Sequence, residues 1–429
     1  MPASIQQEAR ETATVPRMIL LAFLSPAHAF CGTYVGSSGE ALVNRASRVV
    51  LAREGTTTSL TVAMDYEGSL TEFGLLLPVP EVLTADDVRV IEPTLLDRIE
   101  GWSEPRAVAY TCEDLVTETH DEGSVGCAFA AQDYELQKSD STGQAGGVIV
   151  ESSFSLAGYD IVVLSAEESA GLMSWLDTNG YAVPDGGEAI LQEYLDGGSY
   201  FLAARVTYDL SQTSKWLPPL QFSYESDVFS LPIRIGTISA DGPQEVLLYV
   251  LAESVVAISN YPELEVEDEC MWKDDGEGFG AYYAAQLDEA FSAGAGWVSE
   301  YEWSLTTNCD PCTSQGGLTP EELEGLGRAN YHGFLTRLRL RYSPEEATQD
   351  VVLYETNTGV EYANGEQIRF IAYDEHLEFA FPVCGEGWVE DPGQCDGGEA
   401  TVGCGVPVGS GAAGGAGVLL ALAAIRRRK

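Results

Sequence analysis

The pair Cys309 and Cys312, in the stretch NCDPC, has the spacing of a dithiol that could exchange with disulfides. Such chemistry requires a thiolate, and the first cysteine of a redox pair is activated at the N-terminus of a helix. Here the loop-forming residues TSQGG follow directly, and the next helix signal begins only at Thr319. A structural disulfide is therefore the favoured interpretation, and a thiol–disulfide oxidoreductase is the alternative. Zinc is less favoured still, because His120, His332 and His376 are scattered and do not have the spacing of zinc ligands.

The acidic run from Glu265 to Glu277 could bind a hard cation such as calcium through carboxylate oxygens. The run does not match an EF-hand loop, because Met271 and Lys273 occupy positions that need oxygen ligands. Charge runs are usually solvated, so an acidic loop is the favoured interpretation and a cation-dependent adhesin is an alternative. Apart from calcium, the sequence indicates no cofactor.

Motifs that would assign catalysis are missing from the sequence. It contains neither the Gly-x-Ser-x-Gly turn of serine hydrolases nor the His-Glu-x-x-His helix of metalloproteases. Carboxylates are so abundant that any acid–base pair chosen from them would be arbitrary. We therefore assign no catalytic residue and no metal ligand.

The elements that would position these residues belong to an α+β fold with mixed or antiparallel sheets and a few helices. Runs rich in Val, Leu and Thr predict strands over residues 47–80, 146–156, 159–165, 199–210, 218–227, 229–239, 244–258, 296–305, 333–346 and 350–357. Helices are expected over residues 94–102, from Ser165 to Gly180 with a capping box at Glu168, and over 187–198, 281–294 and from Thr319. Residues 117–146 are polar and glycine-rich, which predicts a long loop.

The chain is strongly acidic, with 22 Lys and Arg against 67 Asp and Glu in 429 residues and a net charge of −45. Such a field repels phosphate backbones and anionic lipid headgroups, which excludes nucleic-acid binding. Hydrophobic residues make up 45% of the chain, so a sizeable core can form. We expect a body over residues 30–383, with two subdomains at about 30–240 and 241–383.

Nine cysteines indicate an oxidising compartment and a disulfide-stabilised fold. If the last, Cys404, is set aside, an even number remains for disulfides. Short loops would be closed by Cys112–Cys127 and by Cys384–Cys395. The other candidates are Cys31, Cys270, Cys309 and Cys312.

The N-terminus has the features of an export signal over residues 1–29. Arg17 precedes the short apolar run MILLAFLSPAHA, which ends in the small-x-small pattern that signal peptidase requires. Cleavage is expected after Ala29. Translation could start at Met1 or at Met18, because the first 17 residues are polar for a leader.

The C-terminus has the composition of a stalk followed by a membrane segment. Residues 384–403 are rich in glycine and acid, and Cys404 follows them. Residues 405–425 carry no charge and would span about 31 Å as a helix, which matches a bilayer core. The final RRRK favours a cytoplasmic end. An ordinary anchor that stays on the protein is the alternative to a removable one.

The order of stalk, Cys-Gly, apolar segment and arginine cluster resembles the myxobacterial C-terminal sorting signal. This resemblance implies recognition of residues 404–429 by an intramembrane processing protease, cleavage near Cys404, lipid modification of Cys404 and display on the cell surface.

The body resembles the secreted bacterial family named domain of unknown function 2330. The resemblance runs from about Cys31 to Tyr373, through EFGLLLPVP, YDIVVLSAEESAGLMSWLDTNGYAVP, YFLAARV, YEWSLTTNCDPC and FLTRLRLRY. The family has no established activity, so the resemblance implies no catalytic residue.

These observations predict an exported protein of a Gram-negative bacterium, held at the cell surface or outer membrane through its tail. A binding or structural module is the expected function. The expected partners are the processing protease and the cell envelope, with no nucleic acid.

Overall fold

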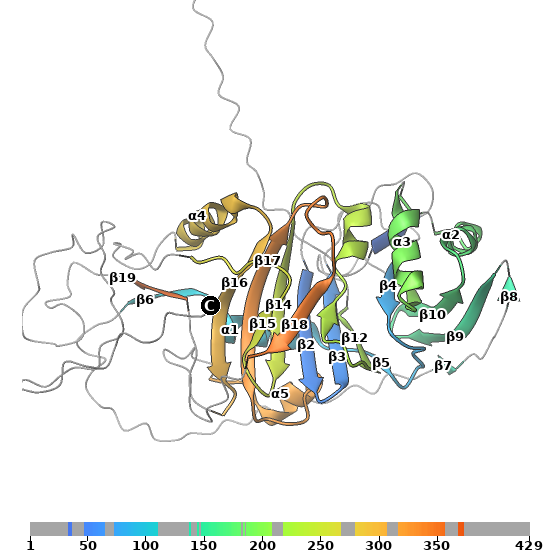
Figure 1. The fold of residues 1–429 in the computed structure, drawn as a ribbon. Helices are drawn as coiled ribbons and strands as arrows, with labels where there is room; N and C mark the ends of the chain where they lie inside the picture. Colours follow the sequence, from blue (N-terminus) through green and yellow to red (C-terminus); the bar gives the residue numbers. More distant parts are fainter. Residues whose placement is uncertain are drawn as a thin grey trace, which may run out of the picture.

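The computed structural model describes most of the body of the chain: residues 33–36, 47–64, 73–109, 137–138, 144–145, 147–181, 183–184, 186–207, 218–266, 279–306, 316–356 and 368–372. Within these residues the fold contains mixed sheets and several helices, which confirms the α+β prediction at this level (Figure 1). All nine cysteines lie outside the described residues, so the predicted disulfides stay predictions.

The first large sheet is antiparallel throughout. Its strand order is β1 (Thr33–Gly36), β4 (Phe73–Val79), β11 (Tyr200–Val206), β10 (Tyr159–Ala166), β9 (Val148–Leu156) and β7 (Gln137–Lys138), and β8 (Gln144–Ala145) also pairs with β9. The β9–β10 turn at Ala157 and Gly158 has positive φ at both residues, the backbone that a two-residue hairpin favours.

The second large sheet has one parallel pair, between β14 and β2. Its order is β16 (Gly296–Ser304), β17 (Phe334–Tyr342), β14 (Gln244–Ala252), β2 (Ser47–Glu54), β3 (Thr57–Met64), β12 (Leu220–Glu225) and β5 (Val88–Val90). The sheet therefore combines strands from both sides of residue 240, and any two subdomains meeting there would share it.

Two small sheets complete the described strands. One has the order β13 (Ser230–Leu231), β18 (Val351–Glu355) and β15 (Val256–Ile258). The other is a parallel pair of β19 (Arg369–Ala372) and β6 (Arg106–Ala109).

Apolar layers lie on both faces of each large sheet, which explains why their strands read as nearly continuous hydrophobic runs. Val49 and Leu51 of β2 belong to a core that joins the two sheets, whereas Val50 and Ala52 pack on the opposite face. That opposite face is covered by α1 (Pro93–Ser103) and α5 (Pro320–Gly325). The result is a helix–sheet–sheet–helix arrangement.

Helices α2 (Ser169–Thr178) and α3 (Gly187–Asp196) cover the outer face of the first sheet, together with the 3₁₀ helix η3 (Arg234–Ser239). Helix α4 (Phe279–Ala290) and the short η4 (Phe291–Ala293) pack beside β16 at the far end of the second sheet (Figure 1). In α4 the buried residues are Tyr283 and Leu287, while Tyr282 is only partly buried.

The structure corrects the predicted start of the helix at Ser165. This residue belongs to β10, where its hydroxyl donates to Glu151 at 2.5 Å. The β9–β10 ladder continues to the Ala166–Val148 pair and so occupies the backbone that a helix would need. Helix α2 begins only at Ser169, after Glu168, which makes no side-chain capping bond.

The strand predicted over 229–239 is also largely wrong. It ends after Leu231, because Pro232 has no N–H for a ladder and η3 follows. In the loop predicted over 117–146, the short strands β7 and β8 are described, and the rest lies outside the described residues.

Candidate functional site

The sequence-derived candidates fall almost entirely outside the described residues. Cys309 and Cys312 lie in a gap between Thr306 and Gly316. The far end of this gap is fixed, because Arg98 of α1 donates to the carbonyl of Gly317 at 2.7 Å. Signal cleavage at Ala29 and lipidation at Cys404 likewise concern residues that the structure does not describe, so thiol–disulfide exchange and processing stay predictions.

The acidic run is described only at Glu265 and Val266. Over the described part of the chain, no three His, Cys, Asp or Glu side chains are grouped so that they could hold a metal ion. Cation-dependent adhesion through residues 267–278 therefore stays a prediction. Within the same described residues, no helix has the length and hydropathy needed to cross a bilayer.

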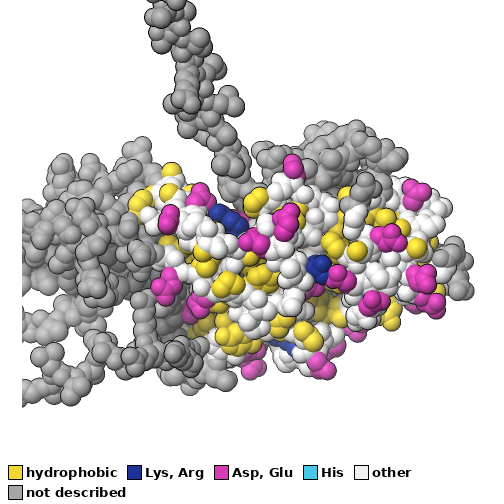
Figure 2. Space-filling view, turned by 45° about the horizontal axis from the view of Figure 1, so that its top comes forward, with side chains coloured by type: hydrophobic (Ala, Val, Ile, Leu, Met, Phe, Trp, Pro, Cys, Tyr) yellow, Lys and Arg dark blue, Asp and Glu magenta, His cyan; other side chains and the backbone are white. Residues whose placement is uncertain are grey.

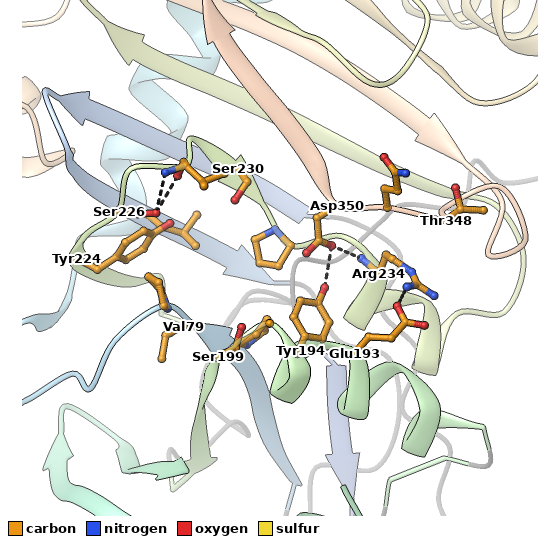
Figure 3. Close-up of a pocket in the computed structure, with 17 residues that line it drawn as sticks. Val79, Glu193, Tyr194, Ser199, Tyr224, Ser226, Ser230, Arg234, Thr348 and Asp350 are labelled. Atoms are coloured by element: carbon orange, nitrogen blue, oxygen red, sulfur yellow. Dashed lines mark hydrogen bonds and ion pairs between the residues drawn. The ribbon is translucent and has the colours of Figure 1, made fainter. Parts of the chain in front are cut away.

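A pocket of about 450 Å³ opens where the first sheet, α3, η3 and the small β13–β18 sheet meet (Figure 3). Its apolar side is contributed by β4 of the first large sheet and by β3 and β12 of the second, and its polar side by α3, η3 and the segment before β18. The lining residues are Leu60, Pro78, Val79, Pro80, Glu193, Tyr194, Gly197, Ser199, Tyr224, Ser226, Val228, Ser230, Pro232, Arg234, Thr348, Gln349 and Asp350.

Asp350 joins three segments of the pocket. Its Oδ1 accepts hydrogen bonds from the Tyr194 hydroxyl at 2.8 Å and from the backbone N–H groups of Ile233 at 2.9 Å and Arg234 at 3.0 Å. These two N–H groups stand at the start of η3, where no intrahelical partner is available. The carboxylate therefore holds η3 and α3 against the start of β18, as Figure 3 shows.

Tyr194 is positioned by the end of α3. The helix is followed by Gly197 and Gly198, and Gly198 has a φ of 81°. The Ser199 N–H donates back to the Tyr194 carbonyl at 2.9 Å, which closes this turn. The Tyr194 hydroxyl also accepts from the Ile235 N–H at 3.2 Å. Burial, followed by the nearby Asp350 carboxylate, raises the pKa of Tyr194 well above its usual value, so the phenol stays a hydrogen-bond donor.

Arg234 and Glu193 form an ion pair at the rim of the pocket. The guanidinium Nε of Arg234 also donates to the Ala347 carbonyl at 3.2 Å. Burial raises the pKa of the Asp350 carboxyl, and its three hydrogen bonds and the charge of Arg234 partly oppose this effect. Among the described residues no donor contacts the second carboxylate oxygen of Asp350, Oδ2.

Sequence reasoning missed this pocket because its contacts are long-range. Asp350 bonds to residues 116 and 156 positions away, and an aspartate before a strand is an ordinary local pattern. The only local signal was Pro232, which interrupts a predicted strand and marks the start of η3.

The face of the molecule seen in Figure 2 is acidic. Figure 2 shows Asp and Glu side chains spread over the visible face, whereas Lys and Arg side chains reach it in only a few places. Anionic ligands are therefore disfavoured over this face by long-range repulsion.

One protein family's sequence model matches residues 25–354, and its description reads "Uncharacterized protein conserved in bacteria (DUF2330)". No curated protein matches the chain. Among solved structures, the chain is similar to the crystal structure of baculovirus P35, with 12% sequence identity and a TM-score of 0.27. That alignment covers 74% of this chain and 98% of the viral chain, and its low score carries no functional argument.

Proposed function

We propose that this chain, which belongs to the uncharacterized bacterial family DUF2330, is an exported binding module held at the cell surface. The family description names no activity, so the proposal is argued from the structure and the sequence of this chain. The pocket that Asp350 organises is the observation that supports a binding role. Its polar groups are fixed by one another before any ligand arrives, and such pre-organisation lowers the cost of binding.

The pocket is better suited to recognition than to covalent chemistry. Its phenol at Tyr194 has a raised pKa, which disfavours the phenolate. The hydroxyl of Ser226 is engaged with the backbone of Val228, at 3.0 Å to the carbonyl and 3.1 Å from the N–H. An apolar wall with a few fixed polar groups is typical of a site that orients a small ligand.

Export and anchoring are supported by the sequence of the two ends. The apolar run before Ala29 fits a cleaved signal. The segment 405–425 fits a bilayer in length, and Cys404 stands between it and the stalk. We propose that a processing protease removes the tail near Cys404 and that the modified cysteine retains the protein at the outer surface.

The mature chain is expected to begin near Phe30 and to lack RRRK, because both terminal segments only direct the protein to its location and are then cleaved off. Mass spectrometry of the protein from its native membrane fraction checks both ends. A Cys404→Ser variant is expected to keep the mature N-terminus but to lose surface retention, as measured by protease accessibility on whole cells. Recovery of an intact tail on the mature protein would leave a permanent anchor instead.

Filling the pocket is expected to abolish binding of at least one small probe. The probes are n-butylammonium, n-butyrate, n-butanol and methyl glucoside, measured by ligand-observed NMR with the purified full chain. Val228→Trp adds bulk at an exposed position of the pocket wall, where the side chain is 57% exposed. Ile149→Trp, at a 42% exposed position of β9 outside the pocket lining, is the matched control. The binding role is wrong if no probe binds the parent chain. It is also wrong if Val228→Trp binds every such probe as well as Ile149→Trp does.

A further inference from the structure

We propose that the pocket binds a primary ammonium group carried on an aliphatic stem. This inference deepens the proposed function, because it rests on the same pocket and names its ligand class.

The unused oxygen of Asp350 supports a ligand that donates a hydrogen bond. Three protein donors already converge on Oδ1, while no described group donates to Oδ2. A carboxylate in a partly buried position needs donors or a counter-charge on its free oxygen. A ligand with a hydrogen-bond donor in the pocket would supply the hydrogen bond that Oδ2 does not receive from the described part of the protein.

The charges that face the pocket favour a cation. The side chains of Glu193 and Arg234 neutralise each other, and Arg234 is further held by the Ala347 carbonyl. The remaining charge is that of Asp350, so the lining carries a net charge of −1 when its carboxyls are ionised. The whole chain adds to this field with its net charge of −45.

An ammonium fits the free oxygen better than a guanidinium does. Guanidinium groups prefer to contact both oxygens of a carboxylate in a planar pair. That geometry is blocked here, because Oδ1 already accepts three hydrogen bonds. An ammonium needs only one carboxylate oxygen, and its other N–H groups can turn toward hydroxyls such as those of Ser199, Ser230 and Thr348 in the same lining.

The opposite wall suits an alkyl stem. Leu60 and Val79 are each 2% exposed and Tyr224 is 8% exposed, so they present a fixed apolar surface to the pocket. Figure 3 shows Val79 and Tyr224 on one side of the pocket and Asp350, Arg234 and Glu193 on the other. An alkylammonium has the same division into an apolar stem and a charged head.

Binding of n-butylammonium tests the proposal, with dissociation constants from ligand-observed NMR titration of the full chain. We expect n-butanol and n-butyrate to bind at least about tenfold more weakly, because neither brings a charged donor. N-acetyl-lysine methylamide tests a lysyl side chain as the source of the ammonium, whereas n-butylammonium represents a free amine. Binding of either one supports the ligand class and identifies its source. Equal binding of n-butanol would overturn it.

Asp350→Asn is the informative variant, because its carbonyl oxygen can keep the three bonds made by Oδ1 while an amide N–H₂ replaces Oδ2. We expect a loss of at least about tenfold in ammonium affinity. Asp227→Asn removes the same charge from an exposed residue beside the pocket that does not line it, and is expected to change affinity less than about twofold. Unchanged affinity in Asp350→Asn would refute the proposal.

A second variant keeps the test decisive if Asp350→Asn does not fold. Val228→Arg places a cation at the exposed rim, so it should weaken n-butylammonium at least about tenfold and leave n-butanol nearly unchanged. Val228→Thr is its isosteric control. If another probe class binds this pocket and the ammonium does not, the ligand class fails while the binding module stands.

Discussion

Replacing Glu300 by glutamine is expected to lower the free energy of unfolding by about 3–5 kcal/mol, because it breaks a buried ion pair. The carboxylate is fully buried beneath α4. Its Oε2 accepts from Arg337 Nε at 2.6 Å, and its Oε1 accepts from Arg339 Nε and from the Tyr283 hydroxyl, the latter at 2.6 Å. Without this charge, the guanidinium groups of Arg337 and Arg339 would remain in the interior with too little negative charge beside them to neutralise their own.

The position of Glu300 depends on a β-bulge in β16. The pairing passes from Ser299–Leu338 directly to Tyr301–Arg337, so Glu300 is the extra residue of the bulge. The bulge places Glu300 in contact with Arg337 and Arg339 of β17. Glu245 of β14 also binds Arg339, and it binds Arg341 as well.

Asp288→Asn is the matched control for Glu300→Gln. Asp288 also pairs with an arginine of this cluster, Arg341, at 2.7 Å, but its side chain is 72% exposed. Exposed pairs contribute about 0–1 kcal/mol, so the control should be nearly as stable as the parent. Urea unfolding of both variants checks this difference. Similar losses in the two variants would contradict the assigned role of burial.

The stabilisation by Glu300 should disappear in acid. Burial alone raises the pKa of Glu300, but the charges of Arg339 and Arg337 outweigh burial and lower it to about 2, from an ordinary value of 4.5. A lowered pKa in the folded state stabilises the protein fully above the ordinary value. This contribution is lost as the pH falls from 4.5 towards 2, so the difference between parent and Glu300→Gln should shrink over that range.

Gly333→Ala is expected to cost about 3 kcal/mol or more, because both the backbone and the space around this glycine exclude a side chain. Gly333 precedes β17 and has a φ of 116°. A Cβ here would come within 2.2 Å of the Ala252 carbonyl oxygen and within 2.8 Å of Arg328 Nη2. Arg328 itself is buried and fixes the adjoining strand end by donating to the Arg53 carbonyl at 2.8 Å.

Gly242→Ala separates backbone strain from the clash. Gly242 has a similar φ of 106° but no neighbouring atom within 4 Å of an added Cβ. Its alanine variant should therefore lose only about 1–2 kcal/mol. Thermal and urea unfolding of the two variants give the comparison. If Gly333→Ala proved no worse than Gly242→Ala, close packing at Ala252 would not be what requires the glycine.

Local sequence signals predicted the elements whose determinants are local. The Ala157-Gly158 turn joins β9 and β10 as expected, and α3 ends at its glycine pair. Thr319 begins α5 with a complete capping box, in which its hydroxyl accepts from the Glu322 N–H and Glu322 accepts from the Thr319 N–H. Each of these signals lies within a few residues of the structure that it determines.

Elements determined by distant partners were predicted less well. Ser165 has the local pattern of a helix start, but pairing with β9 keeps it in a strand. The fold around Pro232 depends on the carboxylate of Asp350, more than 100 residues later. The candidate pocket has the same origin, so a single sequence could not reveal it. The cysteines that drew attention first lie outside the described residues.

The arginine side chains that the structure describes have one feature in common. Each described arginine side chain donates to carboxylates, carbonyls or side-chain oxygens of the protein itself. These arginines therefore make their contacts within the protein. The chain has an excess of acidic residues, and Asp and Glu side chains are spread over the surface seen in Figure 2. Dissolved counterions must balance that excess, so added salt weakens the repulsion between exposed carboxylates more than it weakens the buried ion pairs of Glu300 and Glu245. In this protein, added salt should therefore act as a stabiliser.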